Sequence, residues 1–180
     1  MVKFGIAKML KKSAKLFGLL KNEKNDIDAM LLYVSQEKFN KKQSESQWSI
    51  AQIIAHIYLA ETQTLEATQW RMTNKTEFPK VGIMAYLRVY SSILLFKLKI
   101  KIKAPPFVTP QNEPIDKLTL LEKWQITRAN WSSIVYSFPN KLEDKVVYKH
   151  PILGYLSLCL ALTFMYRHLL RHKGQLKKLI

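Results

Sequence analysis

Glycine, proline, cysteine and acidic residues are all scarce in this sequence. Its 180 residues include only five glycines and seven prolines, so long stretches contain no residue that would break a helix. This scarcity favours an all-helical domain over a β-sandwich or a barrel. The single cysteine, Cys159, excludes a disulfide within the chain. It lies in an apolar run, where we expect it to be a small buried side chain.

Uninterrupted apolar runs of bilayer length are also missing. The stretch 83–96 is broken by Arg88, and the stretch 152–166 is shorter than the roughly 20 apolar residues that a bilayer core requires. In the segment 1–22, lysines are spread through the apolar part, unlike the uninterrupted centre of a signal peptide. We therefore expect a cytoplasmic protein without a membrane span.

Acidic residues are outnumbered by basic ones. The chain has 29 Lys and Arg against 13 Asp and Glu, which gives a formal net charge of +16. Such a surface attracts nucleic acid, anionic lipid or acidic small molecules. An ordinary role in solubility explains the same charge equally well. Hydrophobic residues make up 48% of the sequence, enough for the core of one domain.

The N-terminal segment differs in pattern from the rest. Six lysines interleave with apolar residues over 1–22, a pattern typical of a basic amphipathic helix. Such a helix either lies weakly on an anionic membrane surface or packs its apolar side on the protein. We interpret residues 1–22 as an extension and residues 23–180 as the bundle, with the first bundle helix beginning near Asn25 or Asp26.

The middle of the chain contains one clear helix start and one ambiguous segment. Ser49 and Gln52 have the spacing of a capping box and predict a helix that runs to about Arg71. A further helix is expected over 84–96. Lysines then alternate with apolar residues over 97–103, which is the period of a strand. Four prolines follow, so we interpret this segment as an extended crossover.

Two more helices complete the expected fold. Thr119 and Glu122 repeat the capping-box spacing and predict a helix that ends before Pro139. The last helix is expected from near Ser157 toward Leu179. Four principal helices with one long central crossover describe a four-helix bundle, in which ligand and metal sites form between facing helices.

Three of the four histidines have a spacing that suits a metal site. His168 and His172 lie one helical turn apart on the last helix, so their rings project from the same face. His56 lies on the flank of an earlier helix. Neutral imidazole is a common metal ligand, and three imidazoles from two helices leave an open position for water or substrate. The alternative is a pair of ordinary surface histidines on a basic helix.

Several polar residues near these histidines are candidates for supporting roles. Gln175 follows His172 closely enough to orient its ring, or is simply solvated. His150 precedes a proline and is expected to have a structural role or to line the pocket rather than bind metal. Glu61 is a weak candidate for a general base or a supporting carboxylate, because the helical angle turns it away from His56.

Basic residues close to the second histidine pair form another candidate group. Arg167, Arg171 and Lys173 lie beside the proposed ligands in the sequence and would raise the local concentration of an anionic substrate. The alternative is a solvated basic face near a helix C-terminus.

Two segments together resemble the DinB/YfiT-like superfamily of metal-dependent enzymes. The segment 48–57 resembles that family's tryptophan and hydroxyl residue at a helix start, followed by the ligand His56. The segment 150–157 and its continuation 168–175 resemble the family's last helix, with an H-x-x-x-H pair and a following glutamine. The two segments lie about 110 residues apart, and the resemblance covers most of the chain from residue 25 on.

This resemblance implies an up-down-down-up four-helix bundle with a pocket at one end. There His56, His168 and His172 would bind a divalent ion: zinc, nickel, iron, copper, manganese or cobalt. Some relatives resemble thiol-dependent transferases or isomerases and others hydrolases, so the implied substrate is a small molecule, either anionic or a low-molecular-weight thiol. The resemblance also implies pairing into a homodimer and gives no reason to expect nucleic acid.

The chain departs from the family pattern in its basic N-terminal extension and its lysine-rich crossover. These departures leave an alternative open: a non-catalytic scaffold that binds an anionic partner, either a membrane surface or a nucleic acid, through its basic surface. Binding of that kind would depend steeply on salt concentration.

Overall fold

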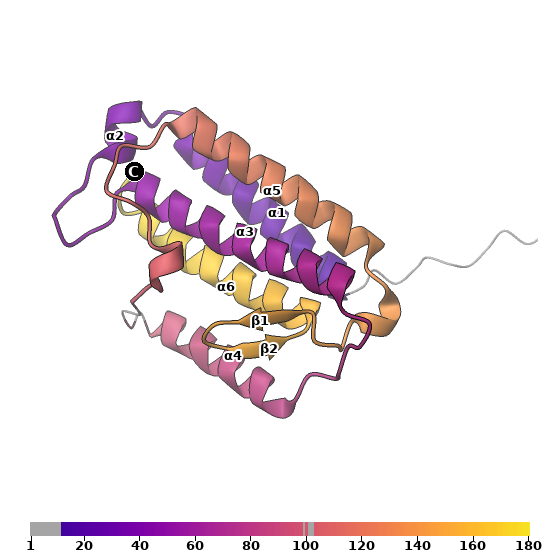
Figure 1. Ribbon diagram of the computed structural model, residues 1–180. Coiled ribbons are helices and arrows are strands. Elements are labelled where there is room, and N and C mark those ends of the chain that lie inside the picture. Colours follow the sequence, from indigo (N-terminus) through magenta and orange to yellow (C-terminus); the bar gives the residue numbers. More distant parts are fainter. Residues whose placement is uncertain (1–11, 99, 101–102) are drawn as a thin grey trace, which may run out of the picture.

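The computed structural model describes residues 12–98, 100 and 103–180 (Figure 1). It is built almost entirely from α-helices, joined by two short 3-10 turns and one small hairpin. In chain order the elements are α1 (Lys12–Leu31), α2 (Gln36–Asn40), α3 (Ile50–Asn74), α4 (Ile83–Lys97), η1 (Pro106–Val108), α5 (Lys117–Ser137), η2 (Asn140–Leu142), β1 (Tyr148–His150), β2 (Gly154–Leu156) and α6 (Leu158–Leu176).

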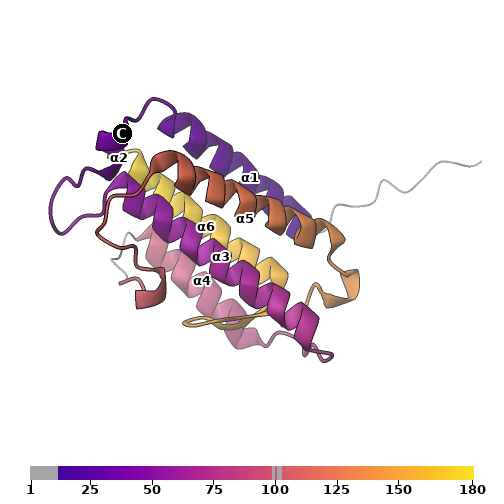
Figure 2. The same ribbon diagram turned by 45° about the horizontal axis from the view of Figure 1, so that its top comes forward.

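Helices α1, α3, α5 and α6 pack side by side as a four-helix bundle (Figures 1 and 2). Helix α1 is antiparallel to α5, because Phe17 near its start packs against Tyr136 near the end of α5, with ring centroids 6.2 Å apart. It is parallel to α6, because Lys173 near the end of α6 pairs with Asp26 of α1. Together with α3, which runs antiparallel to α6, this gives the expected up-down-down-up order. The all-α fold class is therefore confirmed.

The connection from α3 to α5 returns along the whole bundle. Both helices consequently start at the same end, where the side-chain amide of Gln52 donates to the carbonyl of Gln111 at 3.2 Å. Helix α4 forms part of this connection and packs against α6 and the hairpin. The helix predicted over 84–96 is confirmed. The alternating segment 97–103 lies partly outside the described residues, so its strand period stays a prediction.

Helix starts show which capping signals were interpreted correctly. Ser49 and Gln52 form a reciprocal capping box, with hydrogen bonds of 3.2 and 3.1 Å. The box predicted at Thr119 and Glu122 is wrong. Asp116 is the cap instead, and its carboxylate accepts the backbone N–H of Thr119 at 2.8 Å. Aspartate is among the strongest N-cap residues, so α5 begins nearly a full turn earlier than predicted.

The N-terminal boundary also requires correction. Helix α1 runs without a break across the boundary we placed between residues 22 and 23, and it begins well before Asn25. Phe17 and Leu20 are buried in the core, so residues 12–22 pack on the bundle as part of it. Residues 1–11, the remainder of the predicted extension, lie outside the described residues. The short helix α2, which lies between α1 and α3, was not predicted.

A two-stranded hairpin precedes α6 and was not predicted. Its strands pair antiparallel, with Lys149 opposite Tyr155. Three-residue strands are too short for a hydrophobic period to reveal them. Gly154 adopts a φ of 78°, and a Cβ atom there would lie 2.9 Å from the guanidinium of Arg88 on α4. The positive φ favours glycine, whereas the flexible Arg88 side chain could move aside from a Cβ atom.

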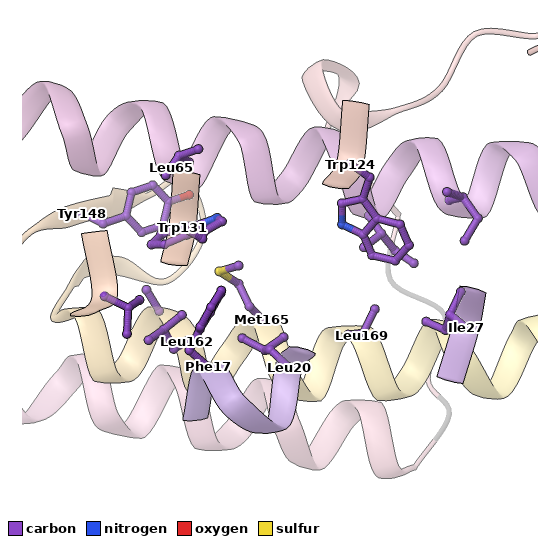
Figure 3. Packing of buried hydrophobic residues seen from close by; sticks show 14 of the residues in the cluster. Phe17, Leu20, Ile27, Leu65, Trp124, Trp131, Tyr148, Leu162, Met165 and Leu169 are labelled. Carbon is purple, nitrogen blue, oxygen red and sulfur yellow. The ribbon is translucent and has the colours of Figure 1, made fainter. Parts of the chain in front are cut away.

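The core runs along the bundle axis and contains two fully buried tryptophans, Trp124 and Trp131 (Figure 3). Leu162, Met165 and Leu169 of α6 pack into the same cluster. In the described part of the chain, no helix combines the length and hydropathy that crossing a bilayer requires.

Candidate metal centre

The structure brings the three predicted histidines together at one end of the bundle. His56 lies in the second turn of α3, and His168 and His172 lie near the end of α6. The Nε2 atom of His168 lies 3.1 Å from that of His56 and 3.0 Å from that of His172. All three potential ligand atoms lie within 4.8 Å of one another. Two helices that are antiparallel and in contact therefore place three imidazole nitrogens around one point.

The outer nitrogens of two rings are held by hydrogen bonds. His56 Nδ1 lies 2.7 Å from the carbonyl oxygen of Val108, and His172 Nδ1 lies 2.6 Å from the side-chain oxygen of Gln175. Both partners are oxygens that only accept, so each Nδ1 must carry the proton and donate. In a neutral ring the other nitrogen then has a free lone pair. The Nε2 atoms of His56 and His172 thus act as acceptors or as metal ligands.

Protons alone cannot satisfy the contacts at the centre of this cluster. His168 Nε2 carries at most one hydrogen, yet it lies about 3 Å from the acceptor nitrogens of both His56 and His172. One hydrogen satisfies one contact, and the acceptor nitrogen at the other contact is left without a donor. A shared cation removes this conflict. A tetrahedral ion with Zn–N bonds of about 2.0–2.1 Å separates neighbouring nitrogens by about 3.3 Å. This is close to the 3.1 and 3.0 Å of the two contacts made by His168 Nε2.

Burial keeps the rings in the form that binds metal. Desolvation lowers the pKa of His56 below its ordinary value, although its bond to Val108 opposes that shift. The pKa of His172 falls to about 3, mainly through burial. The pKa of His168 is lowered well below its ordinary value, first by burial and then by the other histidines and Arg171. All three imidazoles are therefore neutral at neutral pH, and neutral imidazole is the ligand form.

Aromatic side chains surround the three rings. Trp48 packs on His56, with ring centroids 5.0 Å apart. Phe164 stacks on His168 at 5.6 Å with an interplanar angle of 13°, and Phe96 from α4 lies 6.0 Å away from the same ring. These contacts fix the ring planes and exclude water from their faces. Phe96 and Phe164 were not predicted as site residues, because nothing in their local pattern distinguishes a wall of the site from ordinary core.

Comparison with known proteins gives one result. The family model of the DinB superfamily matches residues 20–176, which include every histidine of the cluster. The chain belongs to the DinB superfamily. No curated protein and no solved structure matches it. The match begins inside α1, so most of that helix also belongs to the DinB region of the chain.

Gln175 and His150 occupy different positions relative to the cluster of His56, His168 and His172. The Gln175 side chain contacts His172 directly, as described above. The His150 Nδ1 atom accepts the backbone N–H groups of Ile152 and Leu153, both at 3.1 Å, and thereby closes the hairpin turn. Burial lowers the pKa of His150 to about 4. Phe164 packs against its ring at 4.9 Å. His150 is a structural neighbour of the cluster and not one of its members.

Glu61, the weak candidate for a general base, serves another purpose. Its carboxylate accepts from Arg128 at 2.6 Å and from the indole N–H of Trp124 at 2.8 Å. All three side chains are buried between α3 and α5. The helical angle that turns Glu61 away from His56 points it at α5 instead. Its predicted role beside the metal is therefore wrong.

The three basic candidates have different surroundings in the structure. Lys173 pairs with Glu23 at 2.5 Å and Asp26 at 2.6 Å, so its charge is already neutralised and its predicted anion-binding role is wrong. Arg167 is exposed, and its guanidinium lies over the ring of Tyr166.

Of the three basic candidates, Arg171 is the one that affects the pKa values of the histidine cluster. Its guanidinium donates to the carbonyl of Ile100 at 2.9 Å, lies 5.2 Å from the Phe96 ring centroid and lowers the pKa of both His168 and His172. Arg171 therefore brings a positive charge close to the three imidazole rings.

Proposed function

We propose that this DinB-superfamily protein is a metal-dependent enzyme in which His56, His168 and His172 hold one divalent ion through their Nε2 atoms. One observation carries the proposal: three lone-pair nitrogens converge at contacts that protons cannot all satisfy. Imidazole nitrogens suit zinc, nickel, iron, copper or cobalt, and manganese is the weaker fit because it prefers oxygen ligands.

The electrostatics of the site support an anionic small molecule as substrate. Three neutral imidazoles leave the double charge of an ion uncompensated, and the charged side chain that acts on the rings is the cationic Arg171. No carboxylate contributes to the pKa shifts of His56, His168 or His172. A thiolate or another small anion therefore suits this site better than a cation does.

The bound ion would lower the pKa of a thiol or water and polarise a substrate carbonyl, which are the demands of group transfer and of hydrolysis. The protein's own residues prepare the site for either reaction. Val108 and Gln175 hold two rings in the ligand tautomer. Trp48, Phe96 and Phe164 keep water from the ring faces. We propose transfer of a low-molecular-weight thiol as the first candidate reaction and hydrolysis as the second.

The metal site is tested by elemental analysis of protein purified without an affinity tag or added metal. His56→Asn and His172→Asn retain an amide N–H that replaces the Nδ1 donor while removing Nε2. We expect about one ion per chain in the wild type and a large loss in both variants. His150→Asn is the matched control, because its side-chain oxygen preserves the acceptor in the hairpin turn, and it should retain the ion.

The opposite results have clear meanings. A stoichiometric ion in His56→Asn contradicts the site as drawn. Folded wild-type protein that binds no divalent ion, even when ions are supplied, favours the alternative of a non-catalytic scaffold for an anionic partner.

The substrate class requires a separate measurement. Cobalt-substituted protein titrated with a low-molecular-weight thiol should show a new thiolate-to-cobalt absorption band, and Arg171→Met should weaken thiol binding without removing the cobalt. Turnover assays of thiol addition to an electrophile, and of ester and amide hydrolysis, then distinguish the two reactions. If the thiol leaves the spectrum unchanged while hydrolysis depends on His56, the thiol-transfer proposal is wrong and the hydrolase proposal stands.

A further inference from the structure

Helix α4 has apolar side chains on two opposite faces. One face packs into the core through Ala85, Val89 and Ile93. The opposite stripe follows the spacing i, i+4, i+7 and i+11 and is 55–72% exposed. This stripe, which we call the α4 face, consists of Ile83, Leu87, Tyr90 and Leu94. A surface helix of a globular protein ordinarily directs polar residues outward, so this face requires an explanation.

The apolar surface continues beyond the helix. Leu98, at the C-terminal end of α4, is 62% exposed. On the neighbouring hairpin, Ile152 and Tyr155 are 59% and 54% exposed. Helix α4 contacts strand β2, and Figure 1 shows the hairpin next to this helix. Exposed apolar side chains therefore lie both on the α4 face and on the hairpin next to this helix.

The charge around this surface has one sign. The segment 78–112, which contains α4, has six basic residues and no acidic residue. The segment 145–180, which contains the hairpin and α6, has seven basic residues and again no acidic one. Two exposed members, Arg88 and Lys97, lie on α4 itself. Asp144 lies near the start of α4, where its carbonyl accepts the backbone N–H of Val81, so the excess is of positive charge and not a complete absence of acidic neighbours. Exposed apolar side chains on segments with this positive excess match the chemistry of an anionic lipid surface.

We propose that the α4 face docks this protein on the surface of an anionic lipid bilayer. The exposed apolar side chains would enter the boundary between headgroups and acyl chains, and the surrounding lysines and arginines would contact lipid phosphates. A second copy of the chain fits less well, because two-fold pairing through α4 would bring Arg88 and Lys97 against their own copies without acidic partners. This surface lies on α4 and the hairpin, and not in the segment 1–22 that the sequence suggested.

The docking surface and the histidine cluster share one neighbour. Phe96, near the end of α4, lies 6.0 Å from the His168 ring and 5.2 Å from the guanidinium of Arg171. Docking through α4 would therefore place the histidine cluster close to the lipid surface. The proposal rests on the surface alone and does not require that a metal binds.

The test is co-sedimentation of the full-length protein with vesicles. One set contains phosphatidylcholine only, and the other contains phosphatidylcholine with phosphatidylglycerol. The docking variant is Leu87→Gln with Leu94→Gln, both 56% exposed. The matched control is Leu118→Gln with Ile126→Gln on α5, which are 74% and 56% exposed. Helix α5 lies across the bundle from α4 (Figures 1 and 2). Circular dichroism and thermal melting verify that both variants fold.

We expect the wild type and the control to bind the anionic vesicles, with weaker binding to neutral vesicles and at high salt. The docking variant should lose about tenfold or more in partition coefficient, because two large apolar side chains no longer enter the lipid. A variant lacking residues 1–11 should bind like the wild type.

Several outcomes overturn the proposal. It fails if the wild type binds no anionic vesicle, or if it binds neutral and anionic vesicles equally. It also fails if the control variant loses as much as the docking variant, or if deletion of residues 1–11 abolishes binding that the docking variant retains. Sedimentation showing a dimer that only the docking variant dissociates, without vesicle binding by the wild type, would assign the α4 face to a second copy.

Discussion

Two polar clusters lie five residues apart on helix α3 and differ in what each still needs. Glu61 faces α5, where its carboxylate meets the guanidinium of Arg128 and the indole of Trp124. His56 faces α6, where it meets two further imidazoles. The first, which we call the closed cluster, pairs an anion with a cation, so its charges balance within the chain. The second, the open cluster, brings neutral acceptor nitrogens together, and a shared cation would complete it.

The comparison shows that burial alone does not distinguish a structural polar cluster from a functional one. Glu61, Arg128, His56 and His172 are all at least 95% buried. The proton count at each contact makes the distinction. Glu61 and Arg128 neutralise each other's charge, although two nitrogens of Arg128 have no hydrogen-bond partner in the described structure. The three converging imidazole nitrogens are all acceptors or single donors and lack the hydrogens for their contacts. A candidate metal site is thus recognisable where buried acceptor atoms meet without a donor or cation to join them.

The largest effect should come from opening the closed cluster. Glu61→Leu leaves the Arg128 guanidinium buried without its counter-charge and should lower the free energy of unfolding by about 3–5 kcal/mol. Urea denaturation measures this. The double variant Glu61→Leu with Arg128→Met should recover most of the loss, because the Nε and Nη1 atoms of Arg128 have no hydrogen-bond partner in the described structure. Equal destabilisation by the single and double variants would contradict this account.

Adding a divalent ion should raise the free energy of unfolding through the open cluster, whereas the substitution in the closed cluster lowers it. A divalent ion at about 100 times its dissociation constant should stabilise the folded chain by about 2.7 kcal/mol, because it binds the assembled site and not the unfolded chain. Thermal unfolding with and without a chelator measures the difference. His172→Asn should abolish the response, while Glu61→Gln should leave it in place even in a less stable protein. A response that follows Glu61 rather than His172 would reverse the roles of the two clusters.

Gln175 offers a finer test of the open cluster. Gln175→Leu removes the acceptor that fixes the His172 ring, so the ring is free to turn and to change tautomer. We expect a loss of about 10–100-fold in metal affinity with little change in metal-free stability. Competition with a chromophoric chelator measures the affinity. Gln175→Glu, which keeps an acceptor at the same place, should retain near wild-type affinity.

Cys159 lies outside both clusters, so we expect the metal ion to leave the reactivity of its thiol unchanged. This is the smallest of the expected effects. Burial raises the pKa of the Cys159 thiol to about 11 from an ordinary value of 9.0, with Glu143 adding to the shift. Because a raised pKa keeps the thiol protonated, its thiolate fraction at pH 8 should be about 100-fold below that of an unperturbed cysteine. Iodoacetamide should therefore alkylate it slowly, at a rate that metal does not change. Acceleration or protection by metal would connect Cys159 to the site.

The candidate ligands were predictable because their spacing is local. His168 and His172 share a face at i, i+4 whatever the helix packs against. Their supporting residues were less predictable. Gln175 lies within the same turn and was found, whereas Val108 and Phe96 reach the cluster from the crossover and had no local signal. Lys173 shows the converse error, since its sequence neighbours suggested an anion site while its actual partners lie on α1.

Helix boundaries show the same division between local and distant information. The capping box at Ser49 was correct because the two hydrogen bonds that define it join residues three apart. The predicted start at Asn25 was wrong because the amphipathic pattern of residues 1–22 indicated a helix but not that it continues into the first bundle helix. Tertiary packing of Phe17 and Leu20 in the core decides that.

The sequence by itself determined the helical fold, the family and the three histidines, since each depends on residue types at short and fixed spacings. Only the tertiary structure decided which polar groups meet. Whether Glu61 turns to a histidine or to Arg128, and whether an apolar helix face is covered or exposed, depends on which helices become neighbours. That choice is made by the summed packing of the whole core, to which residues far apart in the chain contribute together.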